Sequence, residues 1–415
     1  MHRILLLTPE LPYPPEQGAS LRNLYILQGL ARCYDVSLLS ASSSEGVREG
    51  LDESPLHEVC PDVRVVYVPL RSRTRRMSKL FSERTPDIAN RFQNALYENA
   101  LSEFLLNGGH GDEVPGRFDA VQIEGLELAH AIRIIRKHSP TTRILFDAHN
   151  AETELQRRAL HTDLSSMRRW PAAAYSYIQT HRLNRYEAWA CQSADWVTSV
   201  SESDAKYLSR YIPTQSLSVI PNCIDVEEYN ESKNSGVETF DLLFTGKMDY
   251  RPNIDAVLWF AREIWPIILE KRPETTWAIV GKNPHSRLER LRSSPGVTVT
   301  GYVDRVQPYL AGAKVVVLPL RMGSGTRLKL LEALASSKAV VSTAQGAEGF
   351  PGIGAEAIEI EDEPEQFASS VLSLLDHQDK RDQLGTTGRR YAEDYDWRRI
   401  IPLFEDVYKT LLRAS

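Results

Sequence analysis

Short apolar runs recur along the whole chain, with helical patterns between them. In the first half these runs are rich in Val, Ile and Leu and are continuous: RILLLT, DVSLLS, VRVVYVP, DAVQIEG, RILFDAH and WVTSVS. A second series follows with DLLFTGK, TTWAIVG, VTVTGYV, VVVLPL, AVVSTAQG and AIEIED. Continuous apolar runs are typical of strands buried on both faces, so the pattern predicts an α/β fold with two parallel, helix-covered sheets.

The length of the chain also favours two cores, because 415 residues exceed what one core normally holds. A polar stretch without periodicity separates the two series of runs. We therefore predict a first domain over 1–228, a linker over 229–239, a second domain over 240–385 and a helical segment over 386–415. Apolar residues recur at helical spacing in the last segment: Ile400, Leu403, Phe404, Val407 and Leu411. This amphipathic helix must dock on one domain or the other.

Composition and charge narrow the class of protein. The chain is 42% apolar and 25% charged with a formal net charge of -6, which indicates a soluble globular protein and disfavours nucleic acid as a partner. The cysteines are far apart, which predicts reduced thiols rather than a zinc site or a disulfide framework: Cys33, Cys60, Cys191 and Cys223. The apolar run at the N-terminus is too short for a signal sequence, and no later stretch is long enough to span a bilayer. We expect a cytoplasmic protein.

A local basic segment offers one exception to this acidic surface. Six cations lie beside Leu80 and Phe81: Arg71, Arg73, Arg75, Arg76, Lys79 and Arg84. Such a patch could contact anionic lipid at the inner face of the plasma membrane, or it could be an ordinary solvated loop. A second basic set around Arg157, Arg158, Arg168, Arg169 and Trp170 allows the same two interpretations.

Candidate chemistry is best sought just after each strand, because open α/β sheets bind ligands beyond the carboxyl ends of their strands. In GSGTRLKLLEALASSKAVVST, residues 323–343, Gly323 and Gly325 turn the chain into a helix that carries Lys329 and Glu332. Amides at the start of a helix form a ready anion site, the lysine can meet a phosphate, and the glutamate can accept from a pair of hydroxyls. Taken alone, the two charges would be an ordinary surface pair.

Other strand ends carry similar polar residues. In LLFTGKMDYRPNID, Gly246 and Lys247 follow a strand and Arg251 precedes a helix, so the two cations could neutralise a diphosphate. Gly18 opens a helix after the first strand. The stretch LFDAHNAETE places His149 at a strand end beside acids and an amide, where it could bind a sugar, act as acid or base, or simply satisfy hydrogen bonds. Ser201, Ser203 or Asp204 can cap a helix.

These motifs together resemble the retaining nucleotide-sugar glycosyltransferases of the GT-B fold, family 4, also called glycosyl transferases group 1. The most specific stretch is GSGTRLKLLEALASSKAVVSTAQGAEGF, and SVIPNCID, FTGKMDYRPNID and VTVTGYV support it. The resemblance covers nearly the whole chain. It implies two Rossmann-like domains that face each other across a cleft, with the C-terminal helix packing back on the N-terminal domain.

The resemblance also implies roles for single residues. Glu332 matches the glutamate that binds the ribose, Lys247 the cation at the diphosphate, and His149 the histidine at the donor sugar, so that His149 and Lys247 act in catalysis. Arg251 or Lys329 takes the place of a second lysine. Ser324 stands where the family usually has a glutamate, which leaves the sugar open. The implied donor-binding set is Gly18, Asn222, Gly246, Lys247, Arg251, Gly323, Ser324, Gly325, Thr326, Arg327, Lys329 and Glu332.

The implied activity is transfer of a hexose, with retention, from a nucleotide diphosphate sugar to a hydroxyl of a glycan, a lipid-linked or a small-molecule acceptor. Such an enzyme would serve the synthesis of cell-surface polysaccharide or glycoconjugates and would require neither a cofactor nor a metal. Two alternatives are a non-hydrolysing nucleotide-sugar epimerase and a catalytically silent partner subunit. An exported sugar-binding protein fits less well, because we find no signal sequence.

Overall fold

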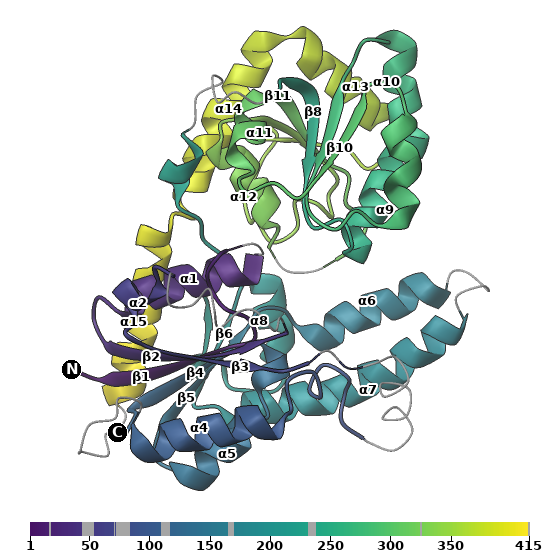
Figure 1. Ribbon diagram of the computed structural model, residues 1–415. Coiled ribbons are helices and arrows are strands. Elements are labelled where there is room, and N and C mark those ends of the chain that lie inside the picture. Colours follow the sequence, from purple (N-terminus) through teal and green to yellow (C-terminus); the bar gives the residue numbers. More distant parts are fainter. Residues whose placement is uncertain are drawn as a thin grey trace. The chain divides into compact units, whose positions relative to one another are not determined.

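The computed structural model describes residues 1–15, 18–43, 54–69, 71, 84–108, 117–164, 170–230, 238–323 and 326–413. The chain forms two compact units, one made of Met1–Pro221 with Ile400–Ser415 and the other of Asn222–Arg399 (Figure 1). The first unit is therefore discontinuous in sequence. Each unit is built around its own parallel sheet, as the two series of apolar runs predict.

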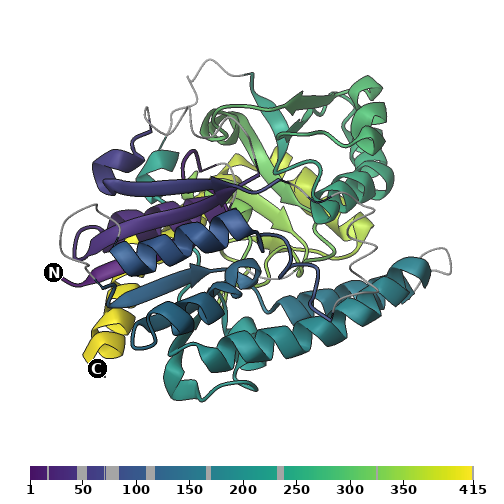
Figure 2. The same ribbon diagram turned by 60° about the horizontal axis from the view of Figure 1, so that its bottom comes forward.

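The first unit contains a seven-stranded sheet in the order β3-β2-β1-β4-β5-β6-β7, and every recorded pairing is parallel. Its strands are β1 (Arg3–Thr8), β2 (Asp35–Ser42), β3 (Asp62–Tyr67), β4 (Ala120–Glu124), β5 (Arg143–Ala148), β6 (Trp196–Ser199) and β7 (Leu217–Val219). Its helices are α1 (Gly18–Leu30), α2 (Leu56–Val59), α4 (Ala95–Asn107), α5 (Ala131–His138), α6 (Glu152–Leu164), α7 (Trp170–Ser193), α8 (Glu202–Leu208) and most of α15 (Trp397–Arg413). Figures 1 and 2 both show α6 and α7 lying side by side beside the sheet.

The second unit contains a six-stranded parallel sheet in the order β10-β9-β8-β11-β12-β13. Its strands are β8 (Phe240–Thr245), β9 (Trp277–Val280), β10 (Val297–Gly301), β11 (Ala313–Leu318), β12 (Ala339–Ser342) and β13 (Glu359–Ile360). The surrounding helices are α9 (Arg251–Trp259), α10 (Trp265–Lys271), α11 (Gln307–Gly312), α12 (Leu328–Ala335), α13 (Pro364–Asp376) and α14 (Gln378–Glu393), with a π-helical turn η6 (Phe260–Ile264) between α9 and α10.

The strand order locates the crevice of each sheet. Sequence neighbours diverge between β1 and β4 in the first sheet and between β8 and β11 in the second. Ligands of such sheets bind where the order reverses, at the carboxyl ends of the strands. The loops that follow β8 and β11 carry Lys247 and Gly323, so both candidate donor loops lie at the reversal point of the second sheet.

Helix α15 packs on the first unit, which confirms the expectation for the C-terminal helix. Its apolar face is buried: Ile400, Ile401, Phe404, Val407, Tyr408 and Leu411. The contact is close, because a Cβ placed on Gly29 of α1 would lie 2.1 Å from Cγ2 of Ile401. Leu403, which the helical spacing assigned to the buried stripe, is instead 40% exposed. It sits at the rim of a groove of about 400 Å³ between α15 and β7.

The chain crosses between the units at Pro221–Asn222, before the stretch at 229–239 that was predicted as the linker. Residues 222–229 are ordered on the second unit, where Val226–Tyr229 form a short 3₁₀ helix, η5. Of the predicted linker, 231–237 lie outside the described residues. The expected helical segment over 386–415 is divided, since α14 belongs to the second unit and the chain crosses back at Arg399–Ile400.

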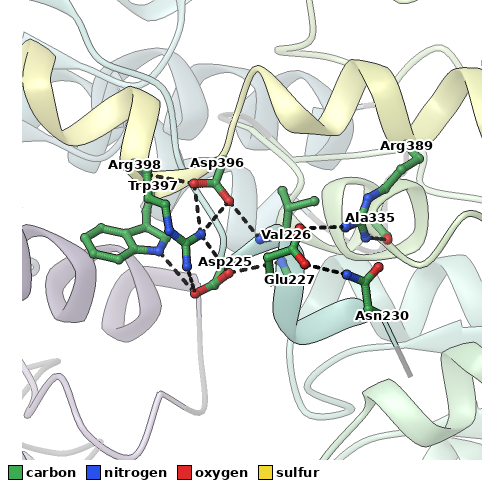
Figure 3. A network of polar contacts seen from close by, with 9 residues as sticks. All are labelled: Asp225, Val226, Glu227, Asn230, Ala335, Arg389, Asp396, Trp397 and Arg398. Atoms are coloured by element: carbon green, nitrogen blue, oxygen red, sulfur yellow. Dashed lines mark hydrogen bonds and ion pairs between the residues drawn. The ribbon is translucent and has the colours of Figure 1, made fainter. Parts of the chain in front are cut away.

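The two crossing segments are bound to each other on the second unit (Figure 3). The backbone amide of Ile224 donates to the Tyr395 carbonyl (3.1 Å), and the amide of Trp397 donates to the Ile224 carbonyl (2.9 Å). Asp225 accepts from both terminal nitrogens of Arg398, each at 3.0 Å, and from the indole nitrogen of Trp397 at 3.2 Å. We call residues 224–226 and 395–398 the crossing clamp.

Candidate functional site

Two glycines shape the loop that follows β8. Gly246 and Gly281 have φ angles of +148° and +152°, and a Cβ on Gly281 would lie 1.7 Å from the carbonyl oxygen of Gly246. Only a residue without a side chain allows two backbones to approach so closely. The loop is held further by Asn253, whose amide nitrogen donates to the Lys247 carbonyl at 2.9 Å. The Lys247 side chain is 37% exposed, with Nζ 3.9 Å from Oδ1 of Asp249.

Lys329 of α12 reaches the same loop. Its Nζ donates to Oδ1 of Asn253 at 2.7 Å and lies 4.5 Å from the centre of the Phe244 ring. A Cβ on Gly246 would be 2.8 Å from this nitrogen, so the amine rests directly against the glycine. Burial lowers the pKa of Lys329 to about 7, and the charge of Glu332 opposes this shift only in part. Lys329 therefore contacts the loop after β8, whereas Arg251, the other candidate for the second cation, lies exposed at the first residue of α9.

Glu332 lies about one turn further along α12 and is half-buried. Its Oε1 accepts from the hydroxyl of Tyr229 at 3.3 Å. Burial raises the pKa of Glu332, although the charge of Lys329 and this hydrogen bond act against it. A carboxylate held on one oxygen by tyrosine keeps its other oxygen for hydroxyl donors.

The glycine-rich turn before α12 is only partly described, because Ser324 and Gly325 lie outside the described residues. Gly323 has a φ of +126°, and its carbonyl accepts from Nε2 of Gln345 at 3.2 Å. The hydroxyl of Thr326 accepts from Nδ2 of Asn222 at 2.7 Å, which joins two of the implied donor-binding residues. Regular helix begins at Leu328, later than the two glycines, and α12 has no side-chain cap among the residues that the structure describes.

In the first unit, His149 follows β5 and is paired with an acid from β4. Its Nε2 lies 2.8 Å from Oε2 of Glu124 and 4.0 Å from Oδ2 of Asp147. Burial alone would lower the pKa of His149, but the hydrogen bond and charge of Glu124 outweigh it, so the pKa is raised. Burial and the charge of Asp147 raise the pKa of Glu124 to about 7. The imidazole of His149 therefore contacts an acidic group, Glu124, whose raised pKa allows the two side chains to share a proton.

Asp147 is neutralised by Arg22 of α1. The arginine Nε and Nη2 donate to the two carboxylate oxygens at 2.8 and 3.1 Å, and the Thr198 hydroxyl donates to Oδ1 at 2.7 Å. Burial would raise the pKa of Asp147, but the guanidinium with its hydrogen bonds lowers it. Ligand atoms of Glu124, Asp147 and His149 lie within 4.8 Å of one another, as in a metal site. Arg22 already supplies a positive charge there, so the cluster is balanced by the protein itself.

Several other sequence predictions concern this edge of the first sheet. Helix α1 begins at Gly18, as predicted. Glu152 accepts from Nδ2 of Asn150 at 3.2 Å, and burial with nearby glutamates raises its pKa to about 8. Ser201 caps α8 by accepting from the amide of Asp204 at 3.1 Å, which confirms the capping interpretation.

Sequence reasoning missed Arg22 and Glu124. The available signal was polar residues inside the otherwise apolar run DAVQIEG and on the helix that opens at Gly18. Position at a carboxyl end singled out His149 and the acids beside it, of which Asp147 is one. It could not show that Arg22, 125 positions earlier, neutralises Asp147.

The two basic segments are described only at their edges. Arg71 forms an ion pair with Asp87 at 3.1 Å, and both Arg157 and Arg158 pair with Glu154. Positions 72–83 and 165–169 lie outside the described residues, so membrane contact stays a prediction that sedimentation with anionic vesicles can test. Among the described helices, none is both long and apolar enough to cross a bilayer.

Comparison with known proteins gives a consistent result. The family model described as Glycosyltransferase Family 4 matches residues 17–228, and the model described as Glycosyl transferases group 1 matches residues 239–377. An uncharacterized 44.6 kDa protein of the cps region of Klebsiella pneumoniae is 21% identical over 178 residues, which are 41% of this chain and 45% of that protein. The match thus spans less than half of this curated relative.

Solved structures match over essentially the full chain. Sucrose-phosphate synthase from Thermosynechococcus elongatus is similar with a TM-score of 0.72 at 16% identity, covering 100% of both chains. HepE from Anabaena in complex with UDP-glucose is similar with a TM-score of 0.65 at 14% identity, covering 99% of each chain. TarM has a TM-score of 0.66 at 10% identity, covering 98% of this chain and 99% of its own.

At these identities the structures establish the fold, two Rossmann-like units of the GT-B type, and the family models add the lineage. The model for the first unit alone covers half of the chain, and the model for the second unit lies within residues 222–399. The chain therefore belongs to glycosyltransferase family 4, the glycosyl transferases group 1.

Proposed function

We propose that the protein is a retaining hexosyltransferase that moves a sugar from a nucleotide diphosphate sugar to a hydroxyl of a glycan, a lipid-linked or a small-molecule acceptor. The observation that carries the proposal is the arrangement at the reversal point of the second sheet. There the amine of Lys329 rests against Gly246, and Glu332 lies one turn further along the same helix. A cation beside a glycine turn can bind a diphosphate, and a carboxylate one helical turn away can accept hydrogen bonds from the ribose hydroxyls.

The charges of this site suit a leaving diphosphate. Lys329 has a pKa of about 7 when nothing binds, so an arriving diphosphate favours its protonated form. The Lys247 side chain is partly exposed, so its amine can move toward the diphosphate as negative charge develops there during cleavage of the glycosidic bond. Fixed cations and amides aimed at a developing charge stabilise the transition state more than the ground state. Because the protein supplies these cations, we propose that transfer needs no metal.

The first unit contributes His149 and the acceptor site in this proposal. The imidazole contacts the donor sugar, and the acceptor hydroxyl attacks from the face that the diphosphate leaves, assisted by a phosphate oxygen. Among the similar structures, HepE was solved with UDP-glucose, and a TarM variant was solved with UDP and alpha-GlcNAc-glycerol. The Klebsiella relative belongs to a cps region. These similarities support a nucleotide-sugar donor and a role in surface polysaccharide or glycoconjugate synthesis.

The first experiment identifies the donor. UDP, GDP, ADP and dTDP, and then their sugars, are screened by thermal shift with the full chain, with and without EDTA. One nucleoside diphosphate should raise the melting temperature, and its sugar should then be transferred to an acceptor with the anomeric configuration kept, as read by NMR. Inversion would contradict the retaining mechanism, and loss of transfer in EDTA would contradict its independence of metal. Epimer exchange without an acceptor would favour the epimerase.

Variants then test the assignment of the site. Glu332→Ala should weaken donor binding, and Lys247→Ala should mainly lower kcat by damaging leaving-group stabilisation. Lys271→Ala, at an exposed lysine at the end of α10, is the matched control and should behave as wild type. Normal turnover in both site variants would refute the assignment.

A further inference from the structure

A line of buried polar side chains runs through the first sheet to His149. Gln122 and Glu124 are two residues apart on β4, so their side chains share one face of the strand, and both are fully buried. Buried polar groups on a central strand carry a desolvation cost unless every one of them is hydrogen-bonded. Their contacts therefore show what holds them there.

The line begins on the C-terminal helix. The hydroxyl of Tyr408 donates to Oε1 of Gln122 at 2.6 Å, and Nε2 of Gln122 donates to Oε1 of Glu124 at 2.5 Å. The other oxygen, Oε2, lies 2.8 Å from Nε2 of His149. Asn23 of α1, with its amide orientation assigned from the hydrogen-bond network, also donates to this oxygen at 2.8 Å. Both oxygens of Glu124 are thus engaged, and the carboxylate has one orientation.

We propose that Tyr408 and Gln122 orient Glu124, and that Glu124 positions His149 with Nε2–H toward the protein and Nδ1 toward the substrate. Glu124, Gln122 and Tyr408 are positioning residues, and the proposal rests on the role assigned to His149 above. A histidine tautomer is set by the hydrogen bond that its other nitrogen makes, so an acceptor at Nε2 leaves Nδ1 for the substrate. The His149 side chain remains 17% exposed, which is enough for contact with a ligand.

The charges around the imidazole support the same assignment. The acidic groups that act on it are Glu124 from β4, Asp147 from β5 and Glu152 at the start of α6, and Arg22 from α1 is the opposing cation, bound to Asp147. With Asp147 neutralised, Glu124 is the partner whose charge most favours the imidazolium. Removing that charge must lower the pKa of His149, whereas Tyr408 acts on it only through Gln122 and Glu124.

Histidine NMR tests the proposal without any substrate. Full-length protein with ¹⁵N-labelled histidine is titrated with acid and base, and His149→Gln assigns the signal. We expect the Nε2–H tautomer and a pKa above the usual value near 6.5. Glu124→Gln should lower that pKa by about one unit or more, and Tyr408→Phe should lower it less. The control is Tyr97→Phe, which deletes a buried hydroxyl that has no hydrogen-bond partner among the described residues; it should leave the signal unchanged.

Turnover of the nucleotide sugar identified by the screen is the second measurement. Tyr408→Phe should lower kcat roughly tenfold with little change in donor KM, since orientation rather than binding is lost. If Glu124→Gln does not fold, Tyr408→Phe decides the matter, because the phenyl ring keeps the packing. If Tyr408→Phe has the same His149 pKa and the same kcat as Tyr97→Phe, the proposal that Tyr408 and Gln122 orient Glu124 is overturned. Normal turnover in His149→Gln would instead remove the catalytic role of His149, while the NMR result would stand by itself.

Discussion

The buried ion pair between Arg22 and Asp147 allows a sharp test of what stabilises the first unit. Side-chain exposures are 2% and 0%, so neither charge is screened by water. Asp147→Asn keeps the shape but leaves the guanidinium buried without its carboxylate. Removing one partner of a buried pair costs about 3–5 kcal/mol, and we expect about 3 kcal/mol because Glu124 also faces the arginine.

The expected loss is measurable as a melting temperature. A unit of roughly 240 residues shifts by about 2–4 °C per kcal/mol, so Asp147→Asn should melt about 6–12 °C lower. The pKa of Asp147 is lowered by folding. Its stabilisation is therefore fully present above the unfolded value of about 4 and disappears as the pH falls through the lower folded value. Wild type and variant should converge only in acid.

Calorimetry gives the melting temperature, and hydrogen exchange of peptides from β5 reports the first unit separately from the second. The control is the double variant Arg22→Met/Asp147→Leu, which removes both charges and keeps an apolar volume. It should regain at least half of the loss, because replacing both partners is often nearly neutral. A drop below about 2 °C in Asp147→Asn would refute the reasoning, as would a double variant less stable than the single one.

Three further outcomes are expected. Lys329→Met should remove the fall in nucleoside diphosphate affinity that wild type shows in calorimetry as the pH rises through about 7 and the amine loses its proton. Gly281→Ala should weaken the same binding at least tenfold by displacing the loop at Gly246, while Gly352→Ala, at a positive φ in open space, should not. Asp225→Asn should lower the free energy of unfolding by about 1 kcal/mol, and by less in high salt, since its Arg398 partner is 49% exposed. A loss of melting temperature relative to wild type that is equal at low and high salt would contradict this.

Much of the fold was predictable because strands buried on both faces leave continuous apolar runs. RILLLT coincides with β1, and twelve such runs mark twelve of the strands. Strand β7 was missed because Leu217–Val219 is short and only half-buried at the edge of the sheet. The polar residues of the predicted linker follow an ordered turn, η5, that already belongs to the second unit, so the chain crosses between the units earlier, at Pro221–Asn222.

The candidate site was predictable only where local pattern determines it. A glycine turn followed by a helix located Lys329 and Glu332, and a strand end located His149. The partners of these residues come from other elements: Asn253 from α9 for Lys329, and Glu124 from β4 for His149. Such pairs cannot be predicted from the sequence, because neither charge nor periodicity indicates which elements lie side by side in the fold.

The crossing clamp holds together the two ends of the segment that forms the second unit. Both ends of Asn222–Arg399 lie together on the second unit, where backbone hydrogen bonds join Ile224 to Tyr395 and Trp397. A segment with adjacent, mutually anchored ends can be exchanged as a block, much as an inserted domain can. If the proposed function holds, grafting this segment from a relative, with cuts outside residues 224 and 398, should transfer nucleotide preference and leave the choice of acceptor unchanged.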